Sequence, residues 1–259
     1  MAHRYLFEQM VRRELRQKYK GSALGVLWYL INPLVLMGAY YLMFGVLFKV
    51  AGDDQPEHYP LFLLVGLVVW IFFSQAVMSS APSLLEHGAL VRKARFPREA
   101  IPASVVTVQL VTFIALLALL TPIIVAIRGT GPALLALPLV LALLFAFVLG
   151  FALAVSVLHA YFRDVAPILS AALLPWFFLS PIFFDPVTAD RFSDHPDLVF
   201  ILEWLNPVAP FIVAVRDVVY DGAFPGLDVL AYIAVAAALV LAGGLALFRR
   251  MQGELAVVV

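Results

Sequence analysis

The 259-residue sequence contains no cysteine, and only 13% of its residues are charged. The absence of cysteine excludes disulfide bonds, a thiol nucleophile and a cysteine-ligated metal site. The 17 basic and 17 acidic side chains cancel, so no overall charge favours binding to nucleic acid. A soluble domain of this length covers its surface with charged side chains, and this chain has too few of them.

Hydrophobic residues make up 64% of the chain, against roughly 45–50% in soluble domains, and the mean hydropathy is +1.00. Six windows free of Asp, Glu, Lys, Arg and His are long enough to cross a bilayer, because about 20 apolar helical residues span its core of about 30 Å. These windows are 21–48, 59–85, 100–127, 129–158, 165–184 and 229–248. The sequence therefore predicts an all-α membrane protein with six transmembrane helices.

A seventh uncharged stretch, 204–215, is too short to cross and contains Pro207 and Pro210. We predict that it forms a re-entrant segment before the last helix, shielded by the other helices. A surface amphipathic loop is the alternative.

Most basic residues lie on one side of the predicted helices: before the first window, in 86–99, at Arg163 and in the tail at Arg249 and Arg250. By the positive-inside rule both termini are cytoplasmic, which the even number of helices requires. The charges of the N-terminal segment are interleaved with apolar residues, unlike those of a cleavable signal peptide.

The N-terminal segment has an amphipathic pattern. Phe7, Val11, Leu15 and Tyr19 recur at helical spacing beside a polar row that includes Arg12 and Arg16. The sequence thus predicts two parts: a cytoplasmic interfacial helix over 1–22 and a transmembrane domain over 23–259. A positively charged anchor without further role is the alternative for the first part.

The chain offers no energy source of its own. It contains no G-x-x-x-x-G-K-[ST] motif, so any ATP is hydrolysed by another subunit. The windows lack the ionisable groups of an ion-coupled carrier, and His159, at a window's end, is interpreted as an interfacial residue. Acidic residues such as Asp53, Asp185 and Asp194 lack catalytic or metal-binding spacing, so we predict no metal and no catalytic site. A membrane-embedded transferase is the less favoured alternative.

The charged connection 86–99 also contains Leu90, Val91 and Phe96. This mixture predicts a short amphipathic element ending near Pro97 and suited to docking a partner. The alternative is that its basic residues only fix the topology.

Four local patterns resemble the ABC-2 family of transport permeases, specifically the exporters of O-antigen, capsule and teichoic-acid polymers. They are RQKYKGSALGVLWYLINP at 16–33, LVRKARFPREAIP at 90–102, the segment 161–181 with its YFRDV start, and LNPVAPFIVAVRDVVYDG at 205–222. Their order, together with the length and the number of windows, extends the resemblance over nearly the whole chain.

The resemblance implies a permease subunit in the bacterial inner membrane that forms a homodimer and binds two copies of a separate ATPase, which holds ATP and magnesium. Segments 83–98 and 160–166 would couple the two proteins. The coupling residues implied are Leu84, Glu86, Leu90, Val91, Arg92, Phe96, Arg163 and Asp164.

The implied substrate is a polysaccharide on a polyprenyl pyrophosphate carrier; export of a lipid or small hydrophobic molecule is the alternative. Aromatic rings pack on the apolar faces of sugars, and a sliding polymer needs weak, repeated contacts. The channel residues predicted are Trp28, Tyr40, Tyr41, Phe44, Trp176 and Phe177. The arginines predicted to attract the pyrophosphate are Arg4, Arg12, Arg13 and Arg16.

Overall fold

The computed structural model describes residues 2–19, 27–47, 56–92, 97–129, 131–185 and 196–255, and every regular element in these ranges is helical. The α-helices are α1 (Ala2–Tyr19), α2 (Trp28–Tyr40), α3 (Tyr59–Ser80), α4 (Ser83–Glu86), α5 (Gly88–Val91), α6 (Ala100–Arg128), α7 (Leu137–Tyr161), α8 (Val165–Leu179), α9 (Pro196–Phe200), α10 (Ala209–Arg216) and α11 (Leu227–Met251). The π-helical segments are η2 (Tyr41–Leu47), η6 (Ile201–Leu205) and η7 (Asp217–Asp221), and the 3-10 segments are η4 (Pro132–Ala136) and η8 (Gln252–Glu254).

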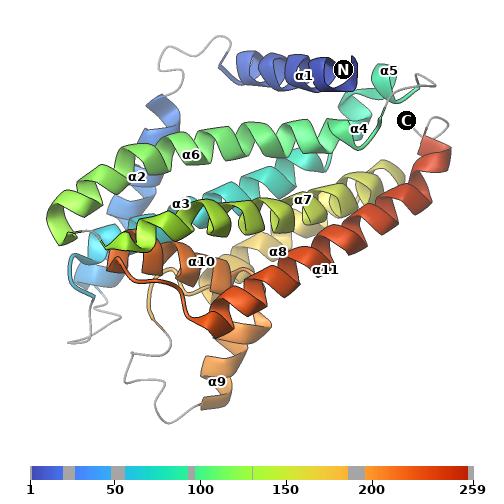
Figure 1. The fold of residues 1–259 in the computed structure, drawn as a ribbon. Coiled ribbons are helices and arrows are strands. Elements are labelled where there is room, and N and C mark those ends of the chain that lie inside the picture. Colours follow the sequence, from blue (N-terminus) through green and yellow to red (C-terminus); the bar gives the residue numbers. More distant parts are fainter. Residues whose placement is uncertain are drawn as a thin grey trace.

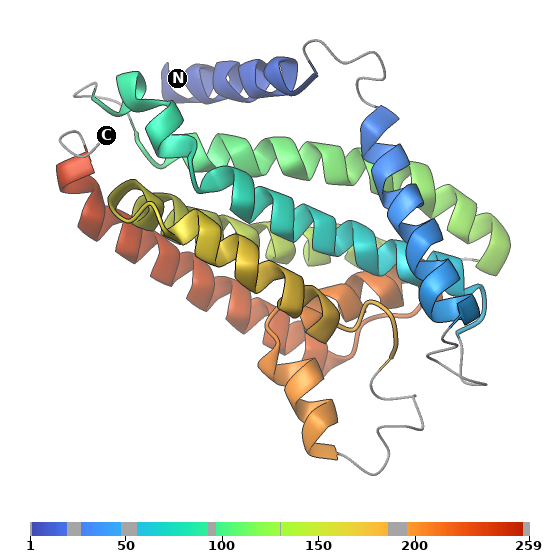
Figure 2. The same cartoon turned by 180° about the vertical axis from the view of Figure 1, so that it is seen from behind.

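The long helices α3, α6, α7 and α11 form one bundle with α8, and α2 crosses it steeply at one end (Figures 1 and 2). Helix α3 lies at the centre, with most of its side chains buried. A helix that is apolar on all its faces is stable only where other helices surround it. The described part of the chain therefore confirms an all-α membrane protein.

Five described helices are long and apolar enough to cross a membrane: Leu30–Leu47, Tyr59–Ser80, Ala100–Arg128, Pro132–Tyr161 and Leu227–Met251. They fall in five of the six predicted windows. The remaining window, 165–184, holds α8 with only 15 residues. Helix α8 ends early because Ser180, which precedes Pro181, has an extended backbone (φ −88°, ψ 147°).

The segment before α11 forms a bent pair of helices, Pro196–Leu205 and Ala209–Asp221, which meet at 86°. Asn206 lies at the bend with an extended backbone (φ −84°, ψ 104°), as expected before Pro207. If the bent pair counts as one broken span, the described chain has six candidate spans. The pair lies where the sequence predicts a re-entrant segment.

Helix α1 packs along α6 and ends at Tyr19, close to the predicted boundary at residue 22 (Figure 1). Met10 is 8% exposed, whereas Arg12, Arg13 and Arg16 are exposed. The helix thus has one covered face and one polar face. Its position at a membrane surface stays a prediction.

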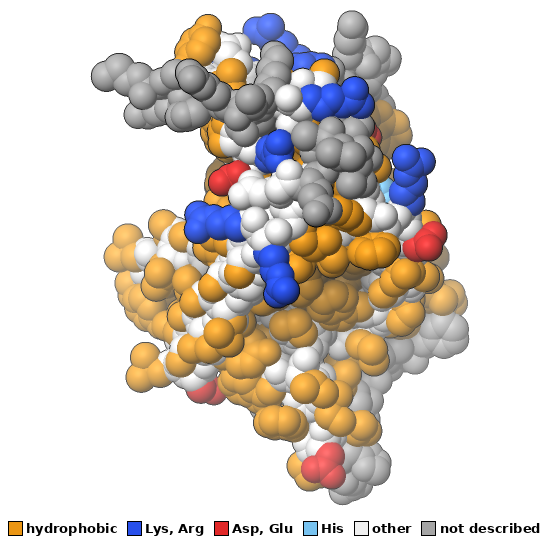
Figure 3. Space-filling view, turned by 90° about the vertical axis from the view of Figure 1, so that its right-hand side faces the viewer, with side chains coloured by type: hydrophobic (Ala, Val, Ile, Leu, Met, Phe, Trp, Pro, Cys, Tyr) orange, Lys and Arg blue, Asp and Glu red, His pale blue; other side chains and the backbone are white. Residues whose placement is uncertain are grey.

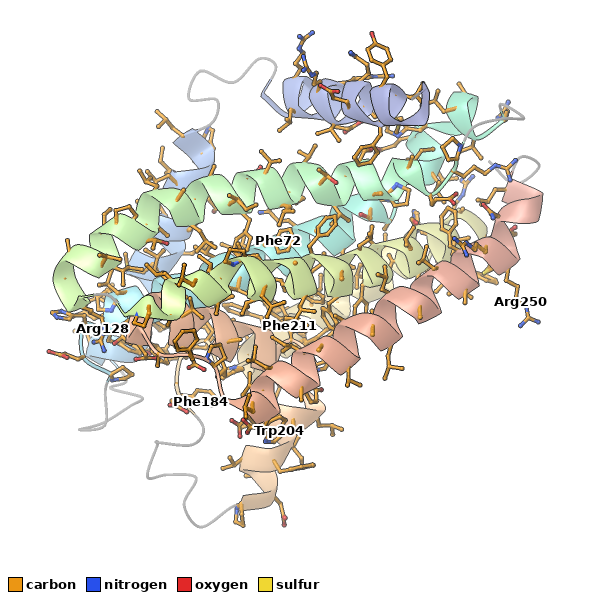
Figure 4. All side chains as sticks on the ribbon, viewed as in Figure 1. Phe72, Arg128, Phe184, Trp204, Phe211 and Arg250 are labelled. Atoms are coloured by element: carbon orange, nitrogen blue, oxygen red, sulfur yellow. The ribbon has the colours of Figure 1, made fainter. Side chains whose placement is uncertain are left out.

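The two ends of the bundle differ in charge. The basic end carries Arg92, Arg98, Arg163, Arg249 and Arg250 beside the acids Glu86, Glu99 and Asp164. The acidic end carries Glu57, Asp185, Asp217, Asp221 and Asp228 beside Arg128 and Arg216. Arg250 and Arg128 mark these opposite ends in Figure 4. Figure 3 looks onto the basic end, where blue arginine side chains outnumber the red acidic ones and apolar side chains cover the flanks.

The interior holds two hydrophobic clusters. The main core joins α3, α6, α7, α10 and α11, with Phe211 near its middle (Figure 4). The second core lies at the basic end and combines Met10 of α1 with Leu84, Val91, Ile101, Leu153, Val157, Ala160, Phe248 and Leu255. Helix α1 and the short helices α4 and α5 are therefore built into the bundle.

Candidate functional site: a membrane groove and a basic docking surface

A groove of about 350 Å³ lies between α2, α3 and α8, the helices that face the viewer in Figure 2. Aromatic rings, aliphatic side chains, hydroxyl groups and carboxamides all contribute to its walls. The lining residues are Asn32, Leu36, Tyr40, Leu67, Trp70, Ile71, Ser74, Gln75, Met78, Ser170, Leu173, Leu174 and Phe177. A groove with this mixed lining can contact both the apolar faces and the hydroxyl groups of a sugar.

Three of the predicted channel residues converge beside this groove. The ring of Tyr40 lies 5.4 Å from that of Phe177 and 6.1 Å from that of Phe44, between ring centroids. Phe183 joins them, with its centroid 5.1 Å from Tyr40 and 4.6 Å from Phe44. Helices α2 and α8 thus meet through an aromatic wall.

The other predicted channel residues point elsewhere. Tyr41 faces Tyr59, with ring centroids 6.3 Å apart, and Trp176 packs against Trp70 and Phe73 inside the bundle. Successive residues of a helix are about 100° apart, so the neighbours Tyr40 and Tyr41, or Trp176 and Phe177, do not share one face. One aromatic residue of each adjacent pair, Tyr40 and Phe177, therefore lines the groove.

Trp28 lines a second cavity of about 270 Å³ between α2, α3 and α6. Its polar lining comes from Asn32, Gln75, Gln109 and Thr112, of which Asn32 and Gln75 also line the groove. Sequence reasoning did not single out these amides, because the windows were found by their lack of charge. Uncharged polar residues inside an apolar window were the signal for them.

The predicted coupling residues fall into a buried and an exposed set at the basic end. Leu84 and Val91 are 0% exposed in the second core, so they hold α4 and α5 in place from within. Leu90 is half-buried, and Glu86 and Arg92 are exposed. Arg163 and Asp164 are exposed between α7 and α8, and Phe96 lies outside the described residues.

Helix α1 is tied to this surface by a polar contact. Nε2 of His87 lies 3.1 Å from Oε1 of Glu14, and Nδ1 of His87 lies 2.9 Å from the carbonyl oxygen of Ser83. Of the predicted pyrophosphate arginines, Arg12 pairs with Glu8 on its own helix at 2.7 Å, and Arg13 and Arg16 are exposed. The side chain of Arg4 is outside the described set.

Within the described ranges, no three His, Asp or Glu side chains are placed to hold a metal ion. The acids and His195 of 186–195 lie outside those ranges. His159 is 8% exposed at the end of α7, so its side chain is buried in the bundle, and its position at a membrane interface stays a prediction.

Comparison with known proteins gives one family and several relatives. The sequence model of the ABC-2 type transporter family matches residues 5–220. An O-antigen export system permease protein RfbA of Myxococcus xanthus is 29% identical over 256 residues, covering 98% of this chain and 95% of that protein. Two proteins of the same name from Klebsiella pneumoniae are 27% and 28% identical, each covering 96% of this chain and 93% of its own length.

Proposed function

The chain belongs to the ABC-2 type transporter family, and on this premise we propose that it is the permease subunit of an ABC exporter that moves an O-antigen-like, lipid-linked polysaccharide out of the cytoplasm. The relatives are named as O-antigen export permeases and match almost the whole chain. The observation that carries the proposal is the groove of α2, α3 and α8. Its aromatic and polar lining suits a sugar polymer that slides through weak, repeated contacts.

The exporter works as a homodimer in which the grooves of two copies enclose one channel. Apolar side chains are exposed on both helices beside the groove: Leu34, Val35, Ile168, Leu174 and Phe178. A single bundle packs its own side chains tightly and leaves little room for a glycan. The wall of Tyr40, Phe44 and Phe177 then lines the channel, while Tyr41 and Trp176 pack against α3.

The basic end faces the cytoplasm of a bacterial cell, and the chain spans the inner membrane with both termini inside. Two copies of a separate ATPase, which holds ATP and magnesium, bind there at Glu86, Leu90, Arg92, Arg163 and Asp164. This chain is the transport subunit and performs no hydrolysis.

ATP-driven movement of the ATPases displaces α4, α5 and the α7–α8 connection. Because Leu84 and Val91 are buried against α6, α7 and α11, a displacement of α4 and α5 moves the ends of these long helices as well. The movement changes the distance between the α2 and α8 walls of the two copies. Arg12, Arg13 and Arg16 of α1 attract the anionic pyrophosphate of the carrier at the membrane surface.

The test is ATP-driven transport in proteoliposomes that contain the permease with its ATPase and a fluorescent lipid-linked glycan. We expect transport only with both proteins and ATP. Equal transport of a carrier lipid without glycan would instead indicate a lipid exporter. Transport by the permease alone, driven by a proton or sodium gradient, would overturn the proposal.

A further inference from the structure

Asn206, at the bend of the bent pair, uses all four of its side-chain hydrogen-bonding positions. Its Oδ1 accepts hydrogen bonds from the indole N–H of Trp176 (2.8 Å) and the backbone N–H of Val208 (3.1 Å). Its Nδ2 donates to Oγ of Ser180 (3.0 Å) and to the carbonyl oxygen of Leu179 (3.3 Å). The residue is 8% exposed, so these partners replace water completely.

These contacts form a closed circuit between the bend and the last turn of α8. Asn206 donates to Ser180, the hydroxyl of Ser180 donates to the carbonyl oxygen of Trp176 (2.9 Å), and the indole of Trp176 donates back to Asn206. Each donor meets an acceptor only when the amide has this orientation and the helix has this rotation. The circuit therefore fixes the rotation of the last turn of α8 relative to the bent pair.

Fixing Trp176 also fixes its neighbour on the groove wall. The ring of Trp176 is held inside the bundle, 5.3 Å from the ring of Phe73 between centroids. Because the next residue of a helix points about 100° away, Phe177 is directed toward Tyr40. Loss of the Asn206 contact would free α8 to turn and to withdraw Phe177 from the aromatic wall.

The bent pair also contacts the turn that follows α8. Nη2 of Arg216, at the end of α10, donates to the carbonyl oxygen of Pro181 at 2.9 Å. The bent pair thus binds the chain on both sides of the end of α8: Asn206 contacts Trp176 and Ser180, and Arg216 contacts Pro181.

We propose that Asn206 is a positioning residue that makes the bent pair and the last turn of α8 move as one unit when the exporter opens. A buried apolar residue would fill the same space without specifying one rotation, whereas the amide circuit is complete in a single arrangement. The inference rests on the proposed function, since it assigns α8 to the channel wall.

Because the sequence contains no cysteine, one introduced cysteine is the only thiol of the permease that a maleimide can label. Leu174 lines the groove and is exposed, so Leu174→Cys reports the rotation of α8 through its rate of labelling by a polar maleimide. Gel electrophoresis separates the permease from its ATPase, so the label on the permease is measured alone. Leu135→Cys, on the exposed segment η4, is the reporter that should not respond.

In the assembled complex, ATP should change the labelling of Leu174→Cys. Asn206→Leu should change this labelling and abolish its response to ATP, with Leu135→Cys unaffected. Glycan exported per ATP hydrolysed should fall by about tenfold, the factor expected from losing about 1.4 kcal/mol of buried hydrogen bonding. The matched control is Ser156→Ala, which removes a fully buried hydroxyl that bonds only to its own helix, at Leu153.

A second variant separates positioning from general stability. Trp176→Phe keeps an aromatic ring but loses the indole N–H together with the second ring. It should lower the coupling in the same direction, and the double variant should be no worse than Asn206→Leu alone if the hydrogen bond to Asn206 is what matters. Unchanged labelling and coupling in Asn206→Leu, or additive effects in the double variant, would overturn the inference. If the unaltered complex exports no glycan, the proposed function fails, whereas the labelling of Leu174→Cys still tests the role of Asn206.

Discussion

The guanidinium of Arg216 lies over the ring of Phe62, with Cζ 3.6 Å from the ring centroid. Arg216 is 5% exposed, and Gly66 leaves the space for it, because a Cβ at Gly66 would lie 2.8 Å from Nη2 of Arg216. A buried cation is tolerated only with such partners. The pair joins α3 to the bent pair at the acidic end.

Arg216→Met should destabilise the protein. The removal of Arg216 takes away the donor to the carbonyl oxygen of Pro181 and a positive charge near Asp185, Asp217 and Asp221, of which Asp221 keeps Arg128 at 3.7 Å. We expect a loss of about 3 kcal/mol, visible as a lower thermal unfolding temperature in detergent. Arg250→Met, at an exposed site, is the control, and equal unfolding temperatures for the two variants would contradict the assignment.

Gly244→Ala should separate α7 from α11, which pack against each other more extensively than any other described pair of elements. A Cβ at Gly244 would collide with the carbonyl oxygen of Gly150, whereas a Cβ at Gly243 would meet nothing within 4 Å. We expect Gly244→Ala to lower the free energy of unfolding by about 1–3 kcal/mol and Gly243→Ala to leave it unchanged, as measured by thermal unfolding. Equal stabilities would show that the helices shift apart without cost.

Glu14→Gln should loosen α1 from α4 and α5, because it removes the charge that faces His87. Met10→Cys, buried in the second core, then becomes more reactive toward a maleimide, by about threefold for a contact of 0.5–1 kcal/mol. Glu8→Gln is the matched control, since the ion pair of Glu8 in the described part of the chain is with Arg12 of the same helix. If the two variants label equally, the contact between Glu14 and His87 does not hold α1 in place.

Leu90→Asp combined with Arg92→Glu should weaken binding of the ATPase. Arg92 is exposed and Leu90 is half-buried at the edge of the second core, whereas Val91 is fully buried in that core, so Asp at Val91 would test stability instead. We expect the amount of co-purified ATPase to fall about tenfold or more, as for central interface residues. Leu135→Asp, an exposed leucine of η4, should leave binding intact, and retained binding in the first variant would place the docking surface elsewhere.

Replacing Arg12, Arg13 and Arg16 with Gln should slow glycan export while the complex still assembles. A basic residue near an anionic surface contributes about 1 kcal/mol, so the rate should fall at least tenfold at low salt and less at high salt. Arg249→Gln with Arg250→Gln, which removes two positive charges where the first variant removes three, is the control for loss of basic residues elsewhere at this end. Unchanged export in assembled complexes would remove α1 from carrier recognition.

The sequence predicts those features that depend on the free-energy cost of placing a single charged side chain in the bilayer. Uncharged windows locate five long helices, and Ser180-Pro181 and Asn206-Pro207 explain why the chain turns where it does. The sequence does not reveal that Leu84 and Val91 face inward, because their burial depends on α7 and α11, which are distant in the chain. The role of Asn206 is hidden for the same reason, since Trp176 and Ser180 come from another helix.

The two hydrophobic cores are joined by Leu149 of α7, which packs against both of them. Beside it, Gly150 and Gly244 bring the backbones of α7 and α11 together without intervening side chains. Flexible side chains absorb displacement, and direct backbone contact does not. This junction therefore leaves α7 and α11 little freedom to shift relative to each other at the place where the two cores meet.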